Sequence, residues 1–254
     1  MPGKVKSSGS KSAGAKAQPP VKDQVEEVVA WLERNGTKKV RDGMARYSVP
    51  SDKAFGVGVG AMQKYAKGLG RSHELAEALW KIDRYETRML ATFLDQPERV
   101  TAAQMDRWVD DFDNWAICDT ACFKLFDQTA HAWLKVEQWA RRREEFVKRT
   151  AFALLWSLTV HDPDAHDEQF IHGLALIERA ATDERDFVKK AVDMALRATG
   201  KRNPALNAAA IDVARRLAQS DDATAKWIGK HALRELTSPS VSRRLSPRTR
   251  AARS

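Results

Sequence analysis

The sequence predicts an all-α protein whose helices stack in pairs as a helical-repeat solenoid with a concave face. Hydrophobic residues recur at spacings of three and four through residues 21–237, which is the period of amphipathic helices. No stretch sustains the alternation of apolar and polar residues that marks a strand. From residue 73 onward the predicted helices follow one another every roughly 18–25 residues, so that pairs recur at roughly 35–45 residues, the period of helical-repeat arrays. Stacked pairs of this kind form a curved solenoid.

Each predicted helix is marked by its apolar spacing, and several are also marked by residues that begin or end helices. In chain order, the helices are one through Val25, Val28, Val29 and Leu32 that ends at Gly36, one long helix over 75–90, one after Thr101, one over 146–158, and four that begin near Asp167, near Asp183, at Pro204 and at Asp221. Thr101 followed by Gln104 is typical of a capping box. Asn203 is a favourable N-cap, and Pro204 suits the first helical position.

Positive charge is concentrated at the two ends of the chain. The net charge is +9, and four Lys in residues 1–20 with five Arg in residues 238–254 account for all of it. We therefore expect one neutral helical domain over 21–237 between two disordered basic tails, 1–20 and 238–254. The tails are either solvated appendages or segments that attract nucleic acid non-specifically. A basic surface on the domain itself requires basic and acidic side chains to lie on different faces.

Several classes of protein do not fit the composition. Cys118 and Cys122 are the only cysteines, which is no disulfide framework and fits a reducing compartment. No apolar run approaches the ~20 residues of a membrane span, and no secretory signal precedes the domain. We expect a cytoplasmic monomer that does not contact membranes. Residues 161–167 contain His and Asp but match no known ligand spacing, so no metal site is predicted. Gly56, Gly58 and Gly60 do not form a dinucleotide fingerprint.

Trp115 and Asp119 are four residues apart, which places them on one face of a helix, one turn from each other. A carboxylate beside an indole suits cleavage of an N-glycosidic bond, because the carboxylate can stabilise the positive charge that develops on the sugar or position the attacking water. An aromatic face also attracts a cationic base. The alternative, which the spacing alone favours, is a core Trp with a solvated or capping Asp.

Aromatic and basic residues alternate over 133–149. The set is Trp133, Lys135, Trp139, Arg141, Arg142, Arg143, Lys148 and Arg149. Arg side chains suit phosphate oxygens, so this stretch is a candidate nucleic-acid contact. The alternative, which this pattern favours, is a loop or helix end with solvated Arg residues.

Motifs along the chain resemble those of a known family. The central run at residues 105–119, MDRWVDDFDNWAICD, resembles the central motif of AlkD-like DNA alkylation-repair proteins. Other segments agree in order: HELA at 73–76 leading to LW at 79–80 and YETR at 85–88, KRTA at 148–151, and LR at 196–197 followed by Lys201, Asn203 and Pro204. The resemblance covers roughly residues 50–215.

This resemblance implies a solenoid of HEAT-like repeats that holds duplex DNA in a basic concave groove. It implies a DNA glycosylase that excises cationic N3- and N7-alkylated purines, without metal or cofactor and without flipping the damaged base into a pocket. Carried over by position, Asp119 matches the catalytic Asp, Trp115 an aromatic that contacts the sugar and backbone of the lesion, and Arg149 an Arg of the same site. Met194, Arg197, Lys148 and Lys201 are the expected DNA-binding residues.

Met194 departs from the family pattern, which has a second Trp at this place. Met is apolar and polarisable but offers no indole face, so one wall of an aromatic cradle is missing. Two functions therefore remain open beside the glycosylase. One is a non-catalytic protein that binds DNA or an unusual DNA structure, and the other is a helical-repeat scaffold for proteins.

Overall fold

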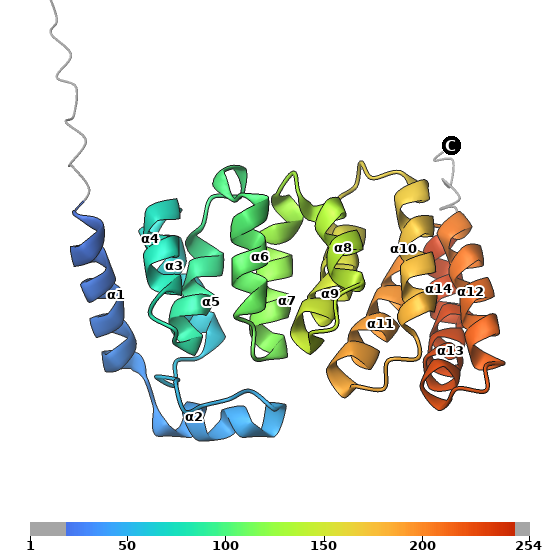
Figure 1. Ribbon diagram of the computed structural model, residues 1–254, viewed down its shortest axis with the longest axis horizontal. Helices are drawn as coiled ribbons and strands as arrows, with labels where there is room; N and C mark the ends of the chain where they lie inside the picture. The colour runs from blue at the N-terminus through green and yellow to red at the C-terminus, as the bar shows by residue number, and fades with distance from the viewer. Residues whose placement is uncertain (1–18, 247–254) are drawn as a thin grey trace, which may run out of the picture.

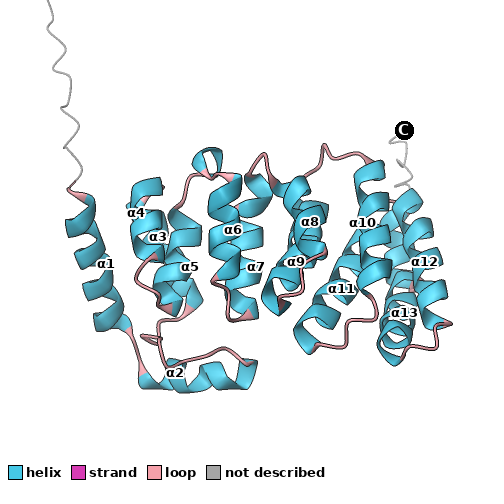
Figure 2. Ribbon diagram, viewed as in Figure 1, coloured by secondary structure: helices cyan, strands magenta, loops and turns pink. Residues whose placement is uncertain are grey.

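The computed structural model describes residues 19–246, and within them the chain forms fourteen α-helices, three short 3-10 helices and no strand (Figure 2). The helices are α1 (Val21–Asn35), α2 (Lys38–Met44), η1 (Ala45–Tyr47), α3 (Val59–Leu69), α4 (His73–Trp80), α5 (Tyr85–Leu94), η2 (Pro97–Arg99), α6 (Ala102–Asp110), α7 (Trp115–Lys124), η3 (Phe126–Gln128), α8 (Ala132–Ala140), α9 (Glu145–His161), α10 (Asp167–Ala180), α11 (Asp186–Thr199), α12 (Pro204–Ala218), α13 (Ala223–Leu236) and α14 (Pro239–Leu245).

The helices stack in two layers, which confirms the predicted all-α helical-repeat solenoid. Helices α5, α7, α9, α11 and α13 pack against one another in succession. The second layer is formed by partners of these helices: α4 packs on α5, α8 on α9, α10 on α11 and α12 on α13. Figure 1 shows the pairs as one row running from α1 to α12–α14, with α2 lying across the lower ends of its N-terminal half.

One continuous hydrophobic core runs between the layers. Trp80 and Trp108 stack in parallel with ring centroids 4.0 Å apart. Trp139 is also fully buried, and its indole N–H donates to Asp106. Lys135 is only 3% exposed and binds the same carboxylate at 2.6 Å. Three of the eight aromatic and basic residues at 133–149, namely Lys135, Trp139 and Arg149, are therefore buried and not available on the surface to nucleic acid.

The prediction of a single long helix over 75–90 is wrong. The structure divides it into α4 and α5, and the break lies at Asp83, whose backbone is left-handed with φ 57°. Asp tolerates this conformation better than most residues. Its carboxylate there is bound by Lys53 and Arg88. The apolar spacing continues across the break, so periodicity alone does not reveal it.

The prediction of disorder from residue 238 onward is also wrong in part, because α14 spans Pro239–Leu245. The Ser238 hydroxyl accepts from the N–H of Val241, Pro239 occupies the first helical position, and Val241 is 6% exposed. A Ser–Pro pair is thus a helix start here rather than a sign of disorder. The rest of the two predicted tails, residues 1–18 and 247–254, lies outside the described residues. No helix in residues 19–246 is long and apolar enough to cross a membrane.

Candidate functional site

Three neighbouring helices of one layer bring the predicted site residues together. Asn114 caps α7 by accepting from the N–H groups of Ala116 and Ile117, so the helix begins at Trp115 and Asp119 follows one turn later. Arg149 comes from α9 and Met194 from α11. One hollow of about 350 Å³ is lined by the side chains of Trp115, Asp119, Arg149 and Met194. The spacing of four residues and the order of the motifs predicted this convergence.

The Arg149 guanidinium holds the Asp119 carboxylate through both oxygens. Nη2 lies 2.7 Å from Oδ2 and 2.9 Å from Oδ1, and Nε lies 3.1 Å from Oδ1. Nη1 donates to the carbonyl of Phe187 at 2.9 Å, which ties the pair to α11. The side chain of Arg149 is 4% exposed and that of Asp119 is 17% exposed. The carboxylate is therefore oriented by its partner while one part of it remains open to the hollow.

Burial controls the titration of Asp119. Burial raises the pKa of the Asp119 carboxyl above the ordinary value for aspartate, and the Arg149 guanidinium counters part of that rise. Burial of a carboxylate costs free energy, and the positively charged Arg149 guanidinium beside Asp119 offsets part of this cost. The site thus presents a carboxylate whose side chain is only 17% exposed.

Trp115 forms a second wall of the hollow. Its indole N–H donates to the carbonyl of Tyr47 at 2.6 Å, and the Arg149 guanidinium carbon lies 5.9 Å from its ring centroid. Trp115 also packs against a small apolar cluster of Met44, Val49 and Ala54. The indole is half-buried, and its N–H is already used, so the part that faces a ligand is the ring itself.

The segment that covers this hollow is held by a buried glutamate. Glu86 on α5 is fully buried, and its carboxylate accepts from the backbone N–H groups of Phe55 at 2.9 Å, Gly56 at 2.7 Å and Val57 at 3.1 Å. Gly56 has φ +89°, and a Cβ there would overlap the carbonyl oxygen of Thr37. This anchoring fixes the start of α3 and the chain before it. We call residues 44–54, which run from the end of α2 across η1 to the loop beyond it, the covering segment.

Arg46 and Tyr47 of the covering segment line the hollow, as do Phe187 and Lys190 of α11. Both Arg46 and Lys190 are exposed, and neither side chain has a hydrogen bond or ion pair within residues 19–246. Sequence reasoning missed these residues. The pattern carried no signal for Arg46 or Tyr47, since they reach the hollow only because the covering segment folds back over α7.

The other predicted DNA-binding residues are paired with acids and do not line this hollow. Lys148 binds Asp183 at 3.1 Å, and Lys201 binds Glu235 at 2.6 Å. Arg197 binds both Asp193 and Glu235. The Arg185 guanidinium, helped by Lys148, lowers the pKa of Asp183 to about 2. Of these ion pairs, only Arg197–Glu235 joins two helices directly, α11 and α13. Met194 alone of the four predicted DNA-binding residues lines the same hollow as Asp119.

The remaining candidate residues have structural partners. His161 binds Asp127 at 2.6 Å, and the carboxylate of Asp162 accepts from the indole N–H of Trp133. Within residues 19–246, no group of three or more His, Cys, Asp and Glu side chains is arranged to hold a metal ion. Cys118 and Cys122 are fully buried, and burial raises the pKa of both thiols. Neither thiol is placed to act as a nucleophile.

A hollow with an oriented carboxylate, an indole and exposed basic side chains therefore lies on a helical solenoid. The family model described as "DNA alkylation repair enzyme" matches residues 28–236. The chain belongs to the DNA alkylation repair family. The predicted membership is thereby confirmed, and the match spans the helical body from α1 to the end of α13.

Two solved structures were found to be similar to this DNA alkylation repair protein, and the first of them shares its fold. One belongs to "a new family of proteins related to the HEAT-like repeat DNA glycosylases with affinity for branched DNA structures" and has a TM-score of 0.69 at 19% identity, covering 84% of this chain and 95% of that one. A designed armadillo repeat protein matches with a TM-score of 0.32 at 13% identity, over 70% of this chain and 92% of its own. The first likeness shows a HEAT-like solenoid. No curated protein matches the chain in sequence.

Proposed function

We propose that this DNA alkylation repair protein is a glycosylase that hydrolyses the N-glycosidic bond of cationic N3- and N7-alkylated purines in duplex DNA. The observation that carries the proposal is the Asp119 carboxylate, which opens into a hollow beside the Trp115 ring and is oriented by Arg149. The proposed partner is double-stranded DNA that contains such a lesion, and no cofactor is needed for the reaction.

The chemistry of the lesion matches what this hollow contains. An alkylated purine is already positively charged, so it departs without protonation by a general acid. The remaining task is to stabilise the positive charge that develops on the sugar, and a carboxylate in partly desolvated surroundings does this directly. The Trp115 ring provides an aromatic surface to which a cationic base or sugar is attracted.

The exposed basic side chains around the hollow suit the negative charge of DNA. Arg46 and Lys190 line the same hollow as Asp119 and make no ion pair with residues 19–246. Their charge favours phosphates near the carboxylate and offsets the repulsion between Asp119 and the DNA backbone. The helical body is close to neutral, so this local segregation of charge supports DNA binding at this face better than its total charge does.

Base release by the purified protein tests the proposal. Methylated duplex DNA is incubated with wild type, Asp119→Asn and Asp164→Asn, and released 3-methyladenine and 7-methylguanine are measured under single-turnover conditions. We expect release by wild type and a loss of about 10²-fold or more for Asp119→Asn, the scale for losing one preorganised electrostatic contact. Asp164 is exposed on the loop between α9 and α10, so Asp164→Asn should keep the wild-type rate.

A second candidate function is non-catalytic binding of DNA or of an unusual DNA structure. Met194 favours it, because this side chain lines the hollow where an aromatic wall would enclose the lesion more fully. The similar solved structure, whose family is described as having affinity for branched DNA, fits the same alternative. Equal rates for wild type and Asp119→Asn would remove Asp119 from catalysis. No release by wild type, together with retained DNA binding, would replace the glycosylase with this alternative.

A further inference from the structure

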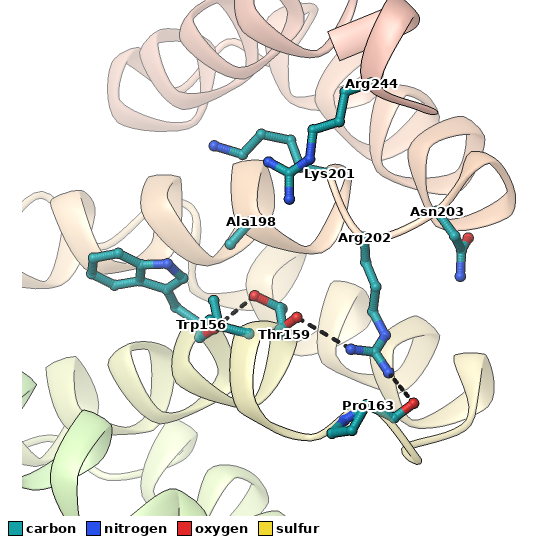
Figure 3. A pocket seen from close by; sticks show the side chains of 9 residues that line it. Trp156, Thr159, Pro163, Ala198, Lys201, Arg202, Asn203 and Arg244 are labelled. Carbon is teal, nitrogen blue, oxygen red and sulfur yellow. Dashed lines mark hydrogen bonds between the residues drawn. The ribbon is translucent and has the colours of Figure 1, made fainter. Parts of the chain in front are cut away.

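A second, larger hollow lies further along the same helices that carry the Asp119 hollow. Its volume is about 630 Å³, and it is lined by the C-terminal ends of α9 and α11 and by α14 (Figure 3). Trp156 follows Arg149 by seven residues on α9, and Lys201 follows Met194 by seven residues across the end of α11. Along α9, seven residues are two helical turns, or ~10 Å, so Arg149 and Trp156 lie on the same side of this helix. We call the second hollow the α14 hollow.

The lining of the α14 hollow includes three basic side chains and one indole beside small apolar and neutral polar residues, and none of the lining residues is acidic. Trp156 is half-buried and is held by an edge-on contact with Phe123, whose ring centroid lies 4.6 Å away. Arg244 from α14 is exposed, and Figure 3 shows its guanidinium directed into the space between α14 and α9. This combination of an indole and a guanidinium is suited to a ligand with both a flat ring and a negative charge.

The basic residues of the α14 hollow differ in how many of their side-chain N–H groups already donate hydrogen bonds. Arg202 donates to the carbonyls of Thr159 at 3.2 Å and Asp162 at 2.8 Å, so it caps the end of α9. Lys201 has one bond, to Glu235 at 2.6 Å, and an ammonium group can donate two more. Arg244 has no side-chain hydrogen bond or ion pair to any residue between 19 and 246. Arg244 is therefore the residue best placed to bind an anion, with Lys201 beside it.

We propose that the α14 hollow is a second DNA site, which holds one unpaired nucleotide with its base stacked on Trp156 and its phosphate on Arg244 and Lys201. A paired base is covered on both faces by its neighbours, so only an unpaired base can offer its face to an indole. The rise of ~10 Å along α9 between Arg149 and Trp156 is within the ~12 Å width of a major groove, so one DNA molecule can reach both hollows. This inference rests on the proposed binding of DNA, but it does not depend on base excision.

Two unmodified duplexes test this site. One is fully paired, and the other has the same sequence with a single extra adenine inserted in one strand. Affinity is measured by fluorescence anisotropy at constant salt. We expect wild type to bind the bulged duplex about tenfold more tightly, in the range for stacking one base on an aromatic side chain. Trp156→Ala and Arg244→Gln should both bring the ratio of the two affinities close to one. With 2-aminopurine as the extra base, its fluorescence should be quenched by wild type and not by Trp156→Ala.

Arg243→Gln is the matched control, because Arg243 is an exposed neighbour on α14 that does not line the hollow. It removes the same charge and should preserve the preference for the bulged duplex. A wild-type ratio of one, or equal effects of Arg243→Gln and Arg244→Gln, would overturn the proposal in favour of diffuse attraction to DNA. Since Arg244 is exposed, Arg244→Gln should leave the fold intact even if Trp156→Ala weakens packing against Phe123. Neither duplex contains an alkylated base, so failure of the glycosylase proposal would not affect these results.

Discussion

Arg149 and Asp119 form a bidentate ion pair across two helices, 30 residues apart in sequence, with Nη2 2.7 Å from Oδ2. The guanidinium is almost fully buried, whereas the carboxylate keeps 17% of its side-chain surface exposed. Arg149 therefore has a structural role, whereas the Asp119 carboxylate can contact a ligand. This asymmetry underlies the first two predictions.

Removal of either partner should destabilise the protein by about 3–5 kcal/mol, because the other charge would remain buried without its counterion. We expect this for both Asp119→Asn and Arg149→Gln, measured as the free energy of unfolding in urea. The double variant should lose clearly less than the sum of the two single losses. Strict additivity would show that the two side chains do not depend on each other.

Excision should decline toward acid pH earlier than an exposed aspartate would allow. The proposed mechanism needs Asp119 ionised, and burial raises the pKa of this carboxyl despite the opposing Arg149 guanidinium. As the pH falls through this raised pKa, the group is protonated and its negative charge is lost. Single-turnover rates measured across pH should show this acid limb for wild type, while Asp119→Asn should show only a low rate without it. An unchanged wild-type rate down to the ordinary aspartate pKa would contradict the assignment.

Replacement of Met194 by Trp should increase excision severalfold if the incomplete aromatic wall limits the reaction. Met194 is half-buried and lines the Asp119 hollow with Phe187 and Lys190, so an indole there would face the ligand. Met194→Leu is the control, since it preserves volume without adding a ring. Single-turnover rates on methylated duplex provide the measurement. A Met194→Trp rate no higher than that of Met194→Leu, in a variant of normal stability, would show that the second aromatic is not what limits this protein.

Trp115→Ala should weaken both DNA binding and excision, because it removes the aromatic wall and the contact that holds the covering segment. Trp115→Phe retains a ring but loses the 2.6 Å hydrogen bond from the indole N–H to the Tyr47 carbonyl. We expect Trp115→Phe to bind methylated DNA more tightly than Trp115→Ala, and both to make residues 44–54 more susceptible to limited proteolysis. Wild-type binding by Trp115→Ala would exclude contact between this ring and DNA.

Gly56→Ala should lower the free energy of unfolding by about 1–3 kcal/mol, whereas Gly58→Ala should be close to neutral. Gly56 has φ +89° and its Cβ position is occupied by the Thr37 carbonyl, while Gly58 has an extended backbone and no atom within 4 Å of its Cβ position. The two sites are two residues apart, so chemical denaturation of both variants isolates the effect of backbone geometry. Equal losses would mean that the loop bound by Glu86 is not as rigid as its hydrogen bonds indicate.

Several features of this protein were decided by local sequence and could be predicted from it. Asn114 and Asn203 cap the helices that follow them because a side-chain oxygen reaches N–H groups only two or three residues away. The four-residue spacing of Trp115 and Asp119 places them on one helical face for the same local reason. Apolar periodicity was sufficient for the all-α class, since each helix buries one stripe of its surface.

Other features were decided only by the tertiary structure, because they depend on residues that are distant in sequence. Lys148, Arg197 and Lys201 are basic in the sequence, yet acids from other turns or helices neutralise them, while Arg46 and Lys190 remain exposed at the Asp119 hollow. Asp83 breaks a periodic apolar run through a backbone conformation that carries no apolar signature. Arg244 faces a hollow only because Val241 packs α14 onto the body. Local propensity selects helices, whereas the pairing of charges across helices follows from packing, and packing decides which side chains remain free to bind DNA.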